Sequence, residues 1–157
     1  MKRYNKQDIL NIYAEQTKRA AMGCDIHAYI EVVHKGDQQR EFVDDFGHIY
    51  LGRNYELFSL MAGVRGGLEP VVGPKGIPTN ISPGVHSAFT EWGIDAHTPT
   101  WLSLEELFEV RERYEKEGET FVPRTLNAAL AAMCELQCFD DNDREIASPR
   151  LVFWFDN

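Results

Sequence analysis

Apolar and polar side chains alternate along residues 24–33, CDIHAYIEVV, which predicts a β-strand with two unlike faces. The apolar face carries Cys24, Ile26, Ala28, Ile30 and Val32. The opposite face carries Asp25, His27, Tyr29 and Glu31. The solvent-facing side of a half-exposed strand ordinarily carries Lys, Thr, Ser and Glu. The face with Asp25, His27, Tyr29 and Glu31 therefore indicates either a reactive site or a polar face that contains a histidine.

The segment after this strand predicts a hairpin, a short helix and a long loop. Residues 41–52 return as a second strand with irregularities at Asp45 and Gly47, and residues 54–63 have helical spacing that ends in glycine. Residues 65–87 hold four of the seven prolines and show no periodicity. A loop of this length in a small domain is typical of a lid or a binding loop, so we expect a functional loop and no domain boundary there.

The second half of the chain predicts two helices and a buried strand. Residues 86–95 are expected to form one helical turn or a short strand. Ser103 and Glu106 fit a capping box that opens the clearest helix, and an Ala-rich helix follows over residues 125–138. The chain closes with RLVFWFDN, residues 150–157, which is apolar on both faces and therefore typical of a strand inside a sheet.

Strands near both ends with helices between them predict a single α+β domain over residues 22–157. We expect a mixed or mostly antiparallel sheet that contains the N- and C-terminal strands of the domain, with three to four helices packed on it. Residues 1–21 predict an N-terminal helical extension, and Met22 is a candidate second translation start. A chain of 157 residues can bury enough apolar surface to fold without disulfides.

Charge and cysteine content narrow the classes of function. The net charge of −9 argues against general binding to nucleic acid or to an anionic membrane, because both require an excess of Lys and Arg. There is no apolar run of about 18 residues, and the first twenty residues are too polar for a signal peptide. The three cysteines lack framework spacing, so we expect reduced thiols and a cytoplasmic protein.

The densest chemical pattern is a repeated Asp-x-His. It occurs as Asp25-Ile26-His27 and again as Asp95-Ala96-His97. On extended backbone, residues i and i+2 share a face, so two such pairs would supply two carboxylates and two imidazoles to one cation. These ligand types suit Zn, Mn or Fe, and the predicted cofactor is a divalent metal ion, Zn, Mn or Mg. The alternative is a polar pocket without metal, in which each histidine only hydrogen-bonds its neighbouring aspartate.

Other residues complete the predicted site. Glu31, two steps further along the strand face, is expected to move protons, with Tyr29 beside it. The predicted substrate-binding residues are Arg53, Arg65, Lys75, Trp101 and Asp156. The three cations would contact a phosphate or carboxylate, although each also fits a solvated surface charge.

The remaining nucleophiles and histidines carry weaker signals. Cys24 would point away from His27 in a regular strand, which opposes a role as a cysteine nucleophile. His34, His48 and His86 are expected to be solvent-facing or hydrogen-bonded, with His86 as a reserve ligand.

Several segments together resemble an uncharacterised family of short bacteriophage and prophage proteins. They are MGCDIH with YxE after it, RNYxLF, AGVR, a GxP in the Pro/Gly segment, DxH before WLxLxEL, and the terminal VFWFDN. The likeness covers residues 22–157 and departs from the pattern at Thr98-Pro99. It implies a phage protein acting in the cytoplasm of an infected bacterium, and it supplies no activity.

The sequence therefore predicts a phage-encoded, metal-dependent hydrolase that acts on a phosphate ester, a nucleotide or a nucleic-acid end. The alternative is a non-catalytic phage protein with a host-takeover or anti-defence role, which binds a host protein or sequesters a nucleotide signal. The expected partners are thus a phosphate-containing small molecule or a host protein.

Overall fold

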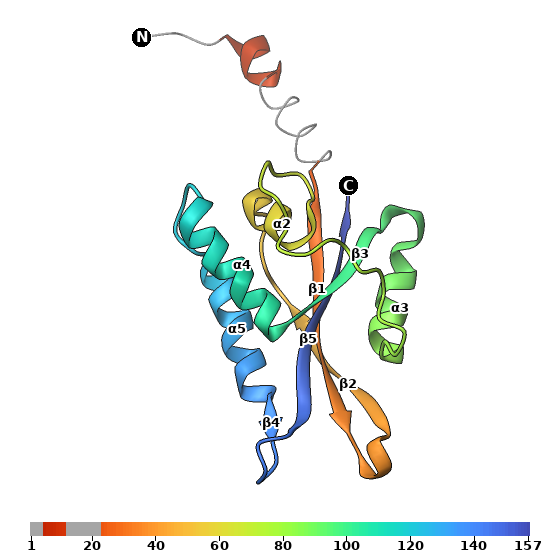
Figure 1. Cartoon of the computed structure of the whole chain (residues 1–157). Helices are drawn as coiled ribbons and strands as arrows, with labels where there is room; N and C mark the ends of the chain where they lie inside the picture. The colour runs from red at the N-terminus through yellow and green to blue at the C-terminus, as the bar shows by residue number, and fades with distance from the viewer. Residues whose placement is uncertain (1–4, 12–22) are drawn as a thin grey trace.

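An open antiparallel sheet lies at the centre of the computed structural model, which describes residues 5–11 and 23–157 (Figure 1). Its strands within these residues are β1 (Asp25–Lys35), β2 (Glu41–Ile49), β3 (His97–Ser103), β4 (Cys138–Phe139) and β5 (Glu145–Asp156). The order is β2-β1-β5-β3, and β4 pairs with the first part of β5. The predicted α+β class is confirmed, and the strands at both ends of the domain lie inside the sheet.

Helices cover both faces of the sheet. They are α2 (Tyr55–Ala62), α3 (Pro83–Trp92), α4 (Leu104–Glu117) and α5 (Arg124–Leu136), with the short 3-10 helices η1 (Asp37–Gln39) and η2 (Gly93–Asp95). In Figure 1, α4 and α5 lie on one side of the sheet and α3 on the other. The larger core joins the apolar sides of α2, α4 and α5 to the sheet, and a smaller core lies under α3.

The two faces of β1 follow the predicted alternation. Ala28 and Ile30 are fully buried in the larger core. Tyr29 faces the other way and packs against the smaller core, which contains Trp154 of β5 and Val85 of α3. The alternation of side chains along β1 therefore places one set in the larger core and the other set on the face that α3 covers.

The local signals for two helices are confirmed. Asn54 caps α2 by accepting a hydrogen bond from the Leu57 N–H, and Gly63 ends the helix in the left-handed conformation, with φ 70°. In α4, the Ser103 hydroxyl and the Glu106 carboxylate each accept from the backbone of the other residue, which completes the predicted capping box.

Two segments differ from their predictions. The helix α3 has ten residues and begins inside the stretch that was predicted as loop, because Ser82 caps the Val85 N–H and Pro83 occupies the first turn. The segment around the second Asp-x-His is also different, since Asp95 ends η2 whereas His97 begins β3.

The predicted N-terminal extension is described only in part. Residues 6–11 are helical, and the rest of the predicted helix, residues 12–21, lies outside the described residues together with Met22. No helix among residues 5–11 and 23–157 combines the length and apolarity that a membrane crossing requires.

Candidate functional site

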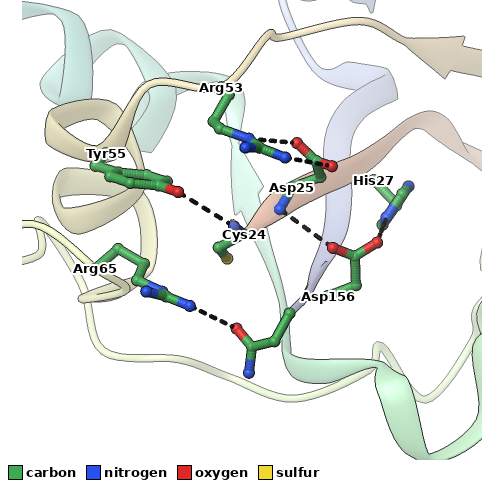
Figure 2. Close-up of polar contacts among 8 residues, drawn as sticks. Cys24, Asp25, His27, Arg53, Tyr55, Arg65 and Asp156 are labelled. Carbon is green, nitrogen blue, oxygen red and sulfur yellow. Dashed lines mark hydrogen bonds and ion pairs between the residues drawn. The ribbon is translucent and has the colours of Figure 1, made fainter. Parts of the chain in front are cut away.

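Polar side chains gather at the end of the sheet where β1 begins and β5 ends. Asp25 pairs with Asp156 in the register of these strands, and His27 pairs with Trp154. Because side chains alternate along a strand, Asp25, His27 and Asp156 all lie on the face that α3 covers. Figure 2 shows Asp25, His27 and Asp156 close together there.

His27 is held in place by a carboxylate and an aromatic ring. Its Nε2 lies 2.9 Å from Asp156 Oδ2, and both side chains are largely buried. The Trp92 ring packs on the imidazole with the ring centroids 4.1 Å apart. An ionised Asp156 carboxylate only accepts hydrogen bonds, so it pairs with the neutral His27 tautomer that carries its proton on Nε2 and leaves Nδ1 as an acceptor.

A second carboxylate is held by an arginine. Arg53 donates from Nε and Nη2 to the two oxygens of Asp25, at 2.9 and 3.0 Å. These hydrogen bonds from Arg53 hold the pKa of the Asp25 carboxyl below its usual range, against the opposing effect of partial burial. The result is a planar, two-bond contact at the mouth of the site (Figure 2).

The Arg53 guanidinium fits against Gly23. A β-carbon at position 23 would lie 2.1 Å from Arg53 Nη1 and 2.5 Å from its Cζ. A residue other than glycine would therefore displace the guanidinium from Asp25.

Two adjacent hollows open around this ion pair. The first, of about 290 Å³, is lined by Trp92, Asp95 and Asp156 together with Asp25 and Arg53. The second, of about 300 Å³, is lined by Asp25, Ile26, His27, His48, Tyr50, Gly52 and Arg53. The Asp25–Arg53 pair thus belongs to both hollows, and His27 lies on the wall of the second.

A second polar group gathers around Asn157, which follows β5 and also lines the first hollow. Asn157 Oδ1 accepts from Arg65 Nη2 at 3.3 Å and lies 3.2 Å from His97 Nε2. Cys24 lies nearby with its thiol fully buried, and burial raises the pKa of that thiol although Arg65 acts in the opposite direction. Arg65 itself has a φ of 65°, an unusual conformation for a residue other than glycine.

The predicted four-residue metal site is not formed. His27 pairs with Trp154 in the register and His97 pairs with Phe155, so the two imidazoles lie on opposite faces of the sheet. Asp25 is bound to Arg53, and Asp95 lies on η2 at the edge of the first hollow. Among the described residues, no group of three or more His, Cys, Asp or Glu side chains is placed to hold a metal ion.

Glu31 does not have the predicted proton-transfer position. It is fully buried, and its Oε1 accepts from Arg150 Nε at 3.0 Å and from Arg150 Nη2 at 2.7 Å. Its Oε2 accepts from the Ser82 N–H at 2.7 Å. Glu31 therefore ties the loop before α3 to the sheet, and Asp156 is the carboxylate that contacts His27.

Lys75 and Trp101 lie elsewhere than predicted, whereas Tyr29 lies on the predicted face of β1, beside His48. The Tyr29 ring stacks on Trp154, and burial raises the pKa of its phenol. Lys75 Nζ lies 3.6 Å from the centroid of the Trp101 ring and is paired with a carboxylate of α4. Trp101 lines a separate hollow of about 270 Å³ beside Arg150, so these two residues do not accompany Arg53.

Two residues of the site were not predicted from the sequence. His48 belongs to the site because of a register shift in β2. The shift lies opposite Ile30 and Glu31, moves β2 by one residue and places the His48 side chain beside Tyr29. Trp92 lies at the end of α3, a helix whose sequence lacks clear helical periodicity of apolar residues. The irregularity at Gly47 was the available signal for His48, but it could not give the direction of the shift.

Comparison of the chain with family models, curated proteins and solved structures gave no match in any of the three.

Proposed function

We propose that the protein cleaves phosphate esters by general acid–base catalysis, with His27 as the proton-transfer group. The observation that carries the proposal is that Asp156 contacts His27 and that His27 lines the second hollow. A carboxylate that fixes one ring nitrogen orients the other and stabilises the imidazolium formed during proton transfer.

Arg53 supplies the contact for an anionic substrate. Its Nε and Nη2 hold Asp25, which fixes the plane of the guanidinium at the junction of the two hollows. A guanidinium held in this way is suited to stabilising negative charge on a phosphoryl group. Metal dependence is not carried into the proposal, because the four predicted ligands do not converge. By the resemblance, the activity would operate in the cytoplasm of an infected bacterium.

The test is turnover of bis(4-nitrophenyl) phosphate and 4-nitrophenyl phosphate by tag-free protein, with and without EDTA. We expect His27→Gln to lower kcat by about 100-fold or more and Asp156→Asn by at least about 10-fold. His86→Gln is the matched control, because His86 is an exposed histidine on α3. EDTA is expected to leave turnover unchanged.

Three results would contradict the proposal: no turnover by the wild-type protein of either ester or of a phosphodiester that carries its own neighbouring hydroxyl, wild-type turnover in His27→Gln, or an equal loss in His86→Gln. Metal content is measured on the same samples. Stoichiometric metal that disappears in both His27→Ala and His97→Ala would instead restore the predicted metal site.

A non-catalytic role is the second candidate, and a different observation favours it. The edge strand β2 exposes Phe42 and Phe46 by 53% and 57%. Exposed aromatic side chains on an edge strand are typical of protein-binding surfaces. Wild-type protein without turnover would favour this candidate over catalysis.

A further inference from the structure

The second hollow contains two histidines on one face of the sheet. Tyr29 and His48 are directly paired in the β1–β2 register, which makes His27 and His48 diagonal neighbours on that face. The Cα atoms of diagonal neighbours lie roughly 7–8 Å apart. A phosphoryl group between the two imidazoles would therefore have a proton acceptor on one side and a donor on the other.

The two histidines differ in their surroundings. His27 is oriented by Asp156 and leaves Nδ1 as an acceptor, whereas His48 is exposed to solvent and contacts Tyr29 through its ring edge. The first arrangement suits a base, and the second suits an acid that exchanges protons with water. Arg53 lines the same hollow together with Asp25, so this pair adds no net charge, and its guanidinium would be the donor that contacts a phosphoryl oxygen.

The candidate nucleophile of the chain faces away from this hollow. The Cys24 thiol is fully buried in the core on the other side of the sheet. The Asp25 carboxylate is engaged by Arg53. An attacking oxygen would then come from water or from the substrate, and a neighbouring hydroxyl of the substrate is held close to phosphorus at a high effective concentration.

We propose that the substrate is a short ribonucleotide phosphodiester, cleaved by attack of its own 2′-hydroxyl. This inference rests on the proposed function. His27 Nδ1 takes the proton of the 2′-hydroxyl, and O2′ forms a bond to phosphorus. The bond from phosphorus to the 5′-oxygen breaks as protonated His48 gives its proton to that oxygen. The products are a 2′,3′-cyclic phosphate and a free 5′-hydroxyl, and Arg53 stabilises the charge on the phosphoryl oxygens.

Charge and exposure favour a small substrate over a long polymer. The chain carries a net charge of −9, and the carboxylates of Asp25, Asp95 and Asp156 line the first hollow. A long polyanion would be repelled by such a surface. Tyr50 is 75% exposed where it lines the second hollow, so its ring is available to stack on one base.

The experiment compares the ribodinucleotide UpA with its 2′-O-methyl analogue in buffer that contains EDTA, with products identified by mass spectrometry. We expect a 2′,3′-cyclic phosphate from UpA and at least about 100-fold slower cleavage of the analogue. His48→Gln is expected to lower the rate on UpA by about 100-fold, with His86→Gln unchanged. Because His48 is exposed, His48→Gln is expected to keep the wild-type unfolding midpoint.

The outcomes separate this inference from the proposed function. Equal cleavage of both dinucleotides, or products that end in a linear phosphate, would show a water nucleophile and overturn the inference while the proposed function stands. Turnover of 4-nitrophenyl esters with intact UpA would also overturn it. Failure to cleave any ester would overturn both.

Discussion

The guanidinium of Arg53 occupies the space that a β-carbon on residue 23 would fill. Its position depends on two residues that are far from it in sequence, since Gly23 leaves the space and Asp25 supplies both acceptors. Gly23 therefore affects the site because it has no side chain. Substitutions near Arg53 should change its placement before they change the fold.

Gly23→Ala tests this placement. We expect the added methyl group to displace the guanidinium and lower turnover of phosphate esters by about 10- to 100-fold, because small misplacements of a charged contact are costly. The unfolding midpoint in urea should change little, since both members of the Asp25–Arg53 pair are partly exposed. Gly67→Ala is the control, because a β-carbon there would meet nothing within 4 Å. Unchanged turnover in Gly23→Ala would contradict the assigned role of Gly23.

The pKa of Asp25 gives a second test of the pair. Arg53→Gln removes the hydrogen bonds that lower this pKa, so the pKa should rise toward its ordinary value. Carboxyl NMR titration measures the change, with Arg40→Gln as an exposed control. Because the folded pKa is the lower one, the pair stabilises the fold above pH about 4, and this contribution disappears as the pH falls through the folded pKa. An unshifted Asp25 titration in Arg53→Gln would show that the contact does not persist in solution.

At the scale of elements, one buried ion pair joins the long loop to the sheet. Glu31 of β1 and Arg150 of β5 are opposite each other in the register, and Asn80 and Ser82 of the loop contact the pair. These contacts fix the point where α3 begins. The last residue of α3, Trp92, packs on the His27 ring. The ion pair therefore acts on the site indirectly, by positioning a helix.

Removing both members of this pair should cost less stability than the two single removals together. Glu31→Leu leaves the Arg150 charge buried without its partner, and we expect a loss of about 3–5 kcal/mol in the free energy of unfolding. The double variant Glu31→Leu/Arg150→Leu should lose less than the sum of the two single variants. Urea unfolding of all four proteins measures the coupling, and strictly additive losses would contradict it.

The elements with strong local signals were predicted, and those set by distant contacts were not. The glycine that ends α2 and the capping box at Ser103 act within one helical turn, so the sequence around them is sufficient. In contrast, α3 contains Gly84 and His86 and depends on the loop contacts of Glu31. Its length could not be inferred from periodicity.

At the scale of the whole molecule, the sequence predicted the sheet and its polar end but not which residues meet there. The alternation in β1 correctly separates the core side from the α3 side. Pairing between β5 and its two neighbours then decides that His27 contacts Asp156 and that His97 contacts Asn157. Such pairings join residues more than 50 positions apart, and no local pattern encodes them.

The position of β5 between β1 and β3 places a constraint on its length. Phe155 faces the larger core, while Asp156 faces His27 on the other side. Inserting or deleting one residue within the paired part of β5 would exchange these faces, which would bury the carboxylate and turn the phenyl ring toward the site. The strand thus sets a frame in which a two-residue change in length keeps each side chain on its own face of the sheet, whereas a one-residue change exchanges the two faces.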